Sequence, residues 1–364
     1  MFRSTLLAAA ALTALTCAYT WPLAAHLAGS VPHDRGDPLL VTWILWWSTK
    51  AVPLTTHWWN APAFHPAAGV FGLSENLLSL VPIAAPFIVL THTPLLAYNV
   101  LFLLSYVLSG LGAYFLGLVL TSRRDAAFVA AVAFAFAPYR LSHLNHLQLL
   151  SSYWMPVALG ALHLYVRRRR RSFAILFAVA WVLQALASGY YLFFLSLLAV
   201  LWLAWFGLGR LTRRDWTTLG LSWVGAVVVL APLLLGYRAI HLKYGLSRSP
   251  VEIEYYSADI AGIVSASADS LLWSGLHTVR EIEAAMFPGV TIVLLVGVGL
   301  FVAVSERHEH RSTLVFYSLT AVLMWLLTLG PHPKWFGRPL GVSGPYALLM
   351  TAGSAERDGG GKRP

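Results

Sequence analysis

Two carboxylates stand close together in the turn that follows the first hydrophobic segment, His33-Asp34-Arg35-Gly36-Asp37-Pro38. Acidic residues are scarce in this chain, with only 15 among 364 residues. A carboxylate beside apolar surfaces can serve as a general base, because partial burial raises its pKa toward the working pH. The chemistry that this turn predicts is removal of a proton from an attacking hydroxyl group. Asp37 is the first candidate for this base and Asp34 the second.

Both aspartates also have structural interpretations. Asp-Pro before an apolar helix is typical of an N-cap followed by proline at the first helical position. Capping would hold Asp37 rigidly, so the two roles are compatible. Asp34 has the alternative of a solvated turn residue paired with Arg35. The choice of the base stays open between the two.

A third carboxylate, Glu75, precedes a second apolar segment in Ser74-Glu75-Asn76. Capping and interaction with the helix dipole are the simpler interpretation of this position. The functional interpretation is a second carboxylate that assists a metal ion or an acceptor. A divalent cation, Mg²⁺ or Mn²⁺, is therefore the candidate cofactor, with no ligand set assigned.

A further polar segment contains Arg140, His143 and His146. On a helix, histidines three residues apart share a face, but two histidines are too few for a closed zinc site. We interpret the segment as a contact for a phosphate or a sugar, with Arg140 as the charged clamp. Interfacial snorkelling is an equally weighted alternative. Arg238 is another candidate for a lipid phosphate, with solvated loop charge as the simpler interpretation.

Apolar helices must position these residues. The chain is 58% hydrophobic and only 11% charged, whereas a soluble protein carries roughly 25% charged residues. The apolar residues come in long runs, which predicts an all-α, polytopic integral membrane protein. In such a protein the net charge of +10 is a topology signal and not a sign of nucleic-acid binding. The single cysteine, Cys17, excludes an intramolecular disulfide.

Short basic gaps between the apolar runs indicate the topology. The positive-inside rule places these gaps and the N-terminus, with Arg3, in the cytoplasm. About nine spans follow from this assignment. The gaps are Arg123–Asp125, Arg167–Arg171, Arg210–Asp215 and Ser305–Arg311, and the spans lie near 6–28, 97–120, 126–138, 146–166, 172–187, 190–208, 217–235, 288–304 and 313–329.

The same assignment places residues 29–96 outside, although this loop contains two apolar segments. Leu39–Pro53 and Leu77–Leu90 are both shorter than the roughly 20 residues that a crossing helix needs. We expect two external helices that rest on the bilayer or dip into it, with the prolines of the second disfavouring a regular helix interior. A second external loop is expected at 236–287, and the whole of 1–350 as one transmembrane domain. Residues 351–364 have the composition of a disordered tail.

The composition and motifs also limit the source of any substrate. The sequence contains no Walker A motif and no Gly-x-Gly-x-x-Gly opening a helix, and the cytoplasmic loops are short. A reaction at the outer face would therefore use an energised donor that a lipid carries.

This layout resembles the GT-C superfamily of membrane glycosyltransferases, and within it a bacterial subgroup of mannosyl- and glycosyltransferases. The resemblance covers about residues 5–350. It implies that a first-loop acidic residue, here Asp37 or Asp34, is the catalytic base. It also implies that a chain ending here is C-terminally shortened. The motifs that carry it are Gly36–Trp47, Phe64-His65-Pro66, Ser74-Glu75-Asn76, Ala135–Arg140, His146-Leu147-Gln148 and Gly189-Tyr190-Tyr191.

The residues and the resemblance together predict a membrane glycosyltransferase that moves a sugar from a polyprenyl-phosphate donor to a glycan, lipid or protein acceptor. We expect it in the cell membrane (inner or plasma), multi-pass, with a cytoplasmic N-terminus, in contact with membrane lipids and with no nucleic acid. The substrate-binding candidates are Glu75, His65, Arg140, His143, His146, Tyr190, Tyr191 and Arg238.

Two alternative functions remain open: a transporter or flippase of a lipid-linked or small anionic substrate, and a non-catalytic membrane assembly protein. A transporter places ionisable residues at mid-membrane and often has repeated halves. The central span residues here are almost wholly apolar, with Gln184 as an exception, which favours surface chemistry over conduction.

The topology predicts that position 92 faces the outside. In a Cys17→Ala background, a cysteine introduced at His92 is expected to react with a membrane-impermeant thiol reagent added from outside. Labelling from the cytoplasmic side alone would show that residues 77–90 cross the membrane.

Overall fold

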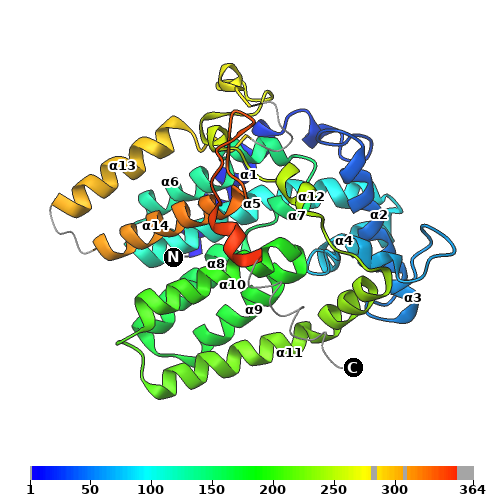
Figure 1. The fold of residues 1–364 in the computed structure, drawn as a ribbon, viewed down its shortest axis with the longest axis horizontal. Coiled ribbons are helices and arrows are strands. Elements are labelled where there is room, and N and C mark those ends of the chain that lie inside the picture. The colour runs from blue at the N-terminus through cyan, green and yellow to red at the C-terminus, as the bar shows by residue number, and fades with distance from the viewer. Residues whose placement is uncertain (1, 280–284, 306–309, 351–364) are drawn as a thin grey trace. The chain divides into compact units, whose positions relative to one another are not determined.

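The computed structural model describes residues 2–279, 285–305 and 310–350, and it is predominantly helical (Figure 1). The predicted all-α class is confirmed for these residues. The strands in the described part are β1 (Lys334–Trp335) and β2 (Arg338–Pro339), which pair antiparallel. The predicted tail at 351–364 lies outside the described residues.

Contacts between residues divide the chain into two compact units. The first unit comprises residues Met1–Phe136 and His143–Leu246. Its elements are α1 (Phe2–Tyr19), η1 (Leu23–Ala25), α2 (Gly36–Lys50), α3 (Thr56–Trp59), η2 (Val70–Leu73), α4 (Val81–Thr91), α5 (Pro94–Thr121), α6 (Arg124–Ala135), α7 (Leu147–Leu150), α8 (Trp154–Arg168), α9 (Arg171–Ala187), α10 (Gly189–Trp202), the π-helical turn η4 (Leu203–Gly207) and α11 (Arg213–Tyr244).

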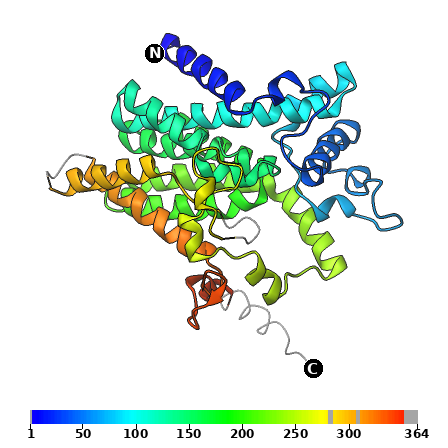
Figure 2. The ribbon, with the colours of Figure 1, turned by 90° about the horizontal axis from the view of Figure 1, so that it is seen from above.

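The second unit comprises Ala137–Ser142 and Ser247–Pro364. In it, α13 and α14 pack side by side (Figure 2). Its elements are most of η3 (Pro138–His143), α12 (Pro250–Tyr255), η5 (Ile260–Val264), η6 (Ser274–Leu276), α13 (Val290–Ser305), α14 (Arg311–Thr328) and the β1–β2 hairpin.

In the described part of the chain, six helical segments are long and apolar enough to cross a membrane, which supports the predicted membrane protein. The other expected spans correspond to α1, α9 and α13, apolar helices of 18, 17 and 16 residues. The count of nine spans stays a prediction. The six segments are Pro94–Thr121, Arg124–His143, Leu147–Arg168, Gly189–Gly207, Arg213–Tyr244 and Arg311–Thr328.

The two apolar segments of the first loop form the helices α2 and α4. Pro82 lies in the first turn of α4, where a missing amide costs nothing. Pro86 lies inside the same helix, so the expectation that these prolines disfavour a regular interior does not hold. The chain beyond position 235 also differs from expectation, because α11 continues to Tyr244 and makes the first part of the loop at 236–287 helical.

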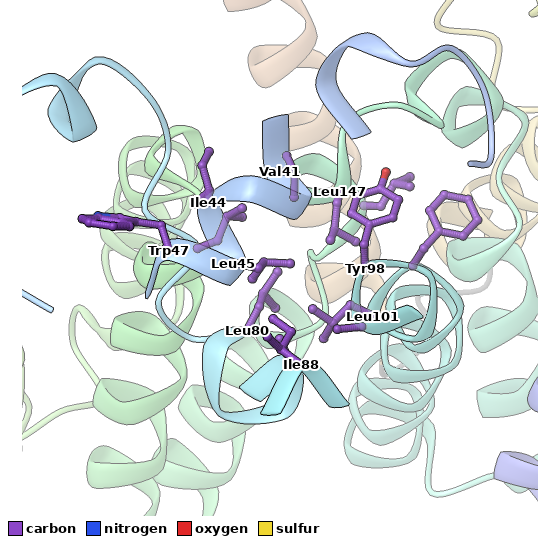
Figure 3. Close-up of a cluster of buried hydrophobic side chains, with 14 of the residues drawn as sticks. Val41, Ile44, Leu45, Trp47, Leu80, Ile88, Tyr98, Leu101 and Leu147 are labelled. Carbon is purple, nitrogen blue, oxygen red and sulfur yellow. The ribbon is translucent and has the colours of Figure 1, made fainter. Parts of the chain in front are cut away.

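The largest core of the first unit lies between α2, α4 and α5 (Figure 3). Ile44 and Leu45 of α2 are almost fully buried, and they share this core with Leu80, Tyr98 and other side chains. Since α2 buries one whole face in this way, its position on the unit is fixed. The acidic turn at its start is fixed with it.

Small residues allow the helices of the first unit to approach closely, as is common where lipid removes the hydrophobic drive between helices. A Cβ added at Gly112 of α5 would lie 2.5 Å from the Tyr153 carbonyl oxygen. A Cβ at Gly117 would lie 2.8 Å from the Cα of Ala127. Because these two glycines have no Cβ, α6 and the start of α8 can pack closely on α5.

Gly112→Ala is expected to lower stability, because the new methyl group meets backbone that cannot rotate away. Overpacking of this kind costs about 1–3 kcal/mol, measurable as a lower thermal midpoint of the detergent-solubilised protein. Gly220→Ala is the matched control, since a Cβ added there would meet no described atom within 4 Å apart from the adjoining backbone of its own helix. The control should be neutral, or stabilising by up to about 1 kcal/mol. Equal midpoints for the two variants would contradict the close contact.

Candidate functional site

The acidic turn is built around Asp34 and not around Asp37. Helix α2 begins at Gly36, and its N-cap is Arg35, whose own side chain makes no capping hydrogen bond. Asp37 therefore lies in the first helical turn, and its expected role as N-cap is wrong. Instead the Oδ1 of Asp34 accepts a hydrogen bond of 2.7 Å from the Gly36 amide. This bond satisfies one of the amides that a helix start leaves without a partner.

Asp34 makes two further contacts, and neither is with Arg35. Its Oδ2 lies 2.9 Å from His33 Nδ1 and accepts a hydrogen bond of 3.2 Å from the Asn145 side chain. The hydrogen bonds from His33 and Gly36 hold the pKa of Asp34 below its usual value. A carboxylate stabilised in its charged form is a weak base. The surroundings of Asp34 thus favour structural work over proton transfer.

Asp37 meets a histidine from a distant part of the chain. Its Oδ2 lies 2.9 Å from His146 Nε2, and the side chains are 42% and 13% exposed for Asp37 and His146. The ring of His143, itself buried, lies with its centroid 5.7 Å from that of His146. The acidic turn and the histidine segment thus lie together in the first unit. Asp37 combines a fixed orientation with an accessible carboxylate.

Helix α5 holds the chain that leads into this cluster. The buried Asn99 side chain donates 2.7 Å hydrogen bonds to the carbonyls of Leu27 and Ser30. The neighbouring Tyr98 is fully buried and lies close enough to Asp37 to interact with it electrostatically. Its hydroxyl makes no hydrogen bond within the described part of the chain. We name the acidic turn, Tyr98, Asn99 and residues 143–146 the acidic cluster.

Sequence reasoning missed three members of this cluster: Tyr98, Asn99 and Asn145. The available signals were weak. Tyr98 and Asn99 are polar groups near the start of an otherwise apolar helix, and Asn145 lies between the two histidines. Nothing in the local pattern connects them to residues about 70 to 110 positions earlier.

Glu75 belongs to a different junction. It does not cap α4, whose N-cap is Leu80. Its Oε2 accepts a 3.0 Å hydrogen bond from the amide of Gly189, the first residue of α10. Burial raises the pKa of Glu75, and the Gly189 amide offsets only part of this effect. Glu75 therefore stabilises a helix start, but that of α10.

The remaining predicted residues lie in several places. The Tyr191 hydroxyl donates a 2.6 Å hydrogen bond to the Leu149 carbonyl and so ties α10 to α7, while Tyr190 is half exposed. His65 and Arg238 are exposed, and neither side chain makes a hydrogen bond or ion pair to another described residue. Arg140 is buried and belongs to the second unit, so it is not assigned to the acidic cluster.

The described residues contain no group of three His, Cys, Asp or Glu side chains that could hold a metal ion. The expectation of a second carboxylate helping to bind a metal thus finds no such grouping around Glu75 in this part of the chain. The chemistry that the acidic cluster can perform is proton transfer at Asp37, with His146 fixing the carboxylate.

The raised pKa of Glu75 predicts a pH-dependent stability. Neutral Glu75 contributes to the free energy of unfolding. This contribution is fully present below the ordinary glutamate pKa of about 4.3, and it is lost as the pH rises through the raised pKa. Glu75→Gln stays neutral and keeps an acceptor for the Gly189 amide. The variant should match the wild type at about pH 4 and have a higher thermal midpoint at about pH 8.

Glu75→Ala is the companion variant, because it removes both the charge and the acceptor. It should be less stable than Glu75→Gln at both pH values. A Glu75→Gln protein that is less stable than the wild type at the higher pH would contradict the desolvation of this carboxylate.

Comparison with known proteins gives one family. No curated protein and no solved structure matches the chain. One family model matches residues 82–355, about three quarters of the chain. The matched region includes His146 and Gly189 and begins after the acidic turn and Glu75. The chain belongs to the family described as a domain of unknown function, DUF6311.

Proposed function

We propose that this protein is a membrane glycosyltransferase with Asp37 as its general base. It transfers a sugar from a polyprenyl-phosphate donor to a hydroxyl group of a glycan, lipid or protein acceptor at the non-cytoplasmic face. The observation that carries the proposal is the 2.9 Å contact between Asp37 and His146. It combines an oriented carboxylate with partial exposure in a chain that has few acidic residues.

The proposed step is a single displacement at the sugar carbon that bears the phosphate. The acceptor oxygen forms a bond to this carbon while the bond from the carbon to the phosphate oxygen breaks. The polyprenyl phosphate leaves with the bonding electron pair, and the acceptor proton moves to Asp37. His146 holds the Asp37 carboxylate in place, so that its orientation is set before the acceptor binds.

Hydrogen bonding distinguishes the two aspartates as bases. Asp34 accepts from an amide, an asparagine and a histidine, and these bonds lower its pKa. Asp37 is not needed to cap α2. The contacts thus support Asp37 as the base and Asp34 as the residue that shapes the turn.

The polar groups inside the candidate spans support surface chemistry over transport. Gln184 is fully buried, accepts from the Trp154 amide and donates to the Ser151 carbonyl. His163 accepts a 3.0 Å hydrogen bond from the indole of Trp202. Both side chains thus make hydrogen bonds between neighbouring helices, which is a structural use.

The topology completes the proposal. Nine spans, a GT-C-like arrangement and a cytoplasmic N-terminus in the cell membrane would place the acidic cluster at the outer face, where lipid-linked sugars are available. The apolar helices of the first unit support this arrangement. No step of the proposed reaction uses a metal ion.

Asp37→Asn tests the base directly. Loss of a general base lowers the rate typically by about 10²–10⁴-fold. We expect this loss for sugar transfer in membranes that contain the protein and a panel of polyprenyl-phosphate hexoses and pentoses. Asp125→Asn is the matched control, since it makes the same chemical change at an exposed aspartate paired with Arg123, and it should keep full activity.

Two further results distinguish the roles. His146→Gln should lose less activity than Asp37→Asn, because the carboxylate remains. Asp34→Asn should also lose less, because an asparagine can still accept from Gly36. Full activity of Asp37→Asn would exclude it as the base. A wild-type protein that transfers no sugar from any donor in the panel would contradict the proposed function.

A further inference from the structure

We propose that the β1–β2 hairpin of the second unit, residues 334–339, is an anchor for the headgroup layer of anionic phospholipids. This inference does not rest on the proposed function. We call these residues the aromatic hairpin. It exposes Trp335 and Phe336, 46% and 50% accessible, beside Lys334 and Arg338.

The composition of the surrounding segment fits a negatively charged, partly apolar partner. Residues 331–345 contain a lysine, an arginine and a histidine and no acidic residue. Leu340 and Val342, just after the hairpin, are also about half exposed. Tryptophan prefers the level of lipid headgroups, where its ring is partly buried and its N–H stays hydrated. Lysine and arginine at that level attract lipid phosphates.

One carboxylate, that of Asp259, fixes the backbone of the hairpin. Asp259 is fully buried, and its oxygens accept hydrogen bonds of 3.0 and 2.7 Å from the amides of Phe336 and Gly337. Its Oδ1 also accepts from Ala261 at 2.7 Å, and Asp259 forms an isolated bridge with Lys334. Both oxygens of the Asp259 carboxylate thus accept from backbone amides of the hairpin. Glu254 also lies beside the hairpin, where its carboxylate pairs with His332 and its carbonyl accepts a 3.4 Å hydrogen bond from the Lys334 side chain. These bonds keep the aromatic side chains at an exposed tip.

The conformation of the tip supports a use for the exposed rings. Phe336 and Gly337 have φ values of 46° and 75°. Two successive residues in this region are typical of a hairpin turn that favours asparagine or aspartate followed by glycine. Phenylalanine is disfavoured there by its side chain. The turn thus accepts a strained aromatic residue and presents it to the surroundings, where local preference alone would select a polar one.

The position of the hairpin in the second unit argues for a lipid surface. Helix α14, a candidate span, ends at Thr328, a few residues before Lys334. The Thr328 carbonyl accepts a 2.9 Å hydrogen bond from the Ala258 amide, next to Asp259. The end of the span and the base of the hairpin are therefore both hydrogen-bonded to the segment Ala258–Asp259. A hairpin tied this closely to the end of a span lies near the membrane surface.

Spin labelling of the full-length protein tests the anchor. Trp335→Cys in a Cys17→Ala background leaves Phe336 in place, and the label reports depth through its collisions with oxygen and with a water-soluble nickel chelate. In vesicles of phosphatidylcholine with added phosphatidylglycerol, we expect higher accessibility to oxygen than to nickel. In phosphatidylcholine alone, the label should be shallower. Phe336→Cys provides a second reporter in case the first variant does not fold.

Charge and fold are controlled separately. Lys334→Gln with Arg338→Gln should abolish the difference between the two vesicle types. A label at Val251, an exposed position on α12, should not change in response to this pair of substitutions.

Two results would overturn the proposal. A label at 335 or 336 that meets nickel as freely as a label in buffer would show that the tip is in water, which favours a protein or a soluble carbohydrate as its partner. Equal depth in both vesicle types would exclude recognition of anionic headgroups.

Discussion

Backbone groups at breaks between apolar helices need partners within the protein, because lipid supplies none. In this chain a few polar side chains meet that need, and each joins segments that are distant in sequence. Asn99 holds two carbonyls of the connection after α1. Gln184 uses both ends of its amide on the break between α7 and α8. Asp259 accepts hydrogen bonds from the hairpin amides of Phe336 and Gly337. The arrangement of the connections depends on these bonds.

The acidic cluster follows from the same constraint. Because Asp34 satisfies the Gly36 amide, helix α2 starts one residue before Asp37. The carboxylate of Asp37 is then directed to His146 and not to its own backbone. The buried side chains next to Asn99, and those of the core between α2 and α5, fix this geometry. Two aspartates that look alike in sequence thus acquire different surroundings.

Local pattern and charge were sufficient to predict the helical class and the helices near α2 and α4. They were insufficient where the outcome depends on a distant partner. Glu75 was assigned to the helix that follows it, whereas its amide partner is Gly189. Asp37 was predicted to cap α2, a role that the competing bond of Asp34 excludes. Neither hydropathy nor spacing encodes such long-range hydrogen bonds.

The number of backbone hydrogen bonds that each carboxylate accepts separates Asp34 and Asp259 from Asp37. Asp259 is buried and accepts from three amides, and Asp34 accepts from an amide and two side chains. Protonating either would break bonds that the fold requires, so neither suits a cycle in which a proton is taken up and released. Asp37 faces His146, and its side chain is 42% exposed. Within the described fold, Asp37 differs from the other two less by its acidity than by making no side-chain hydrogen bond that caps its helix.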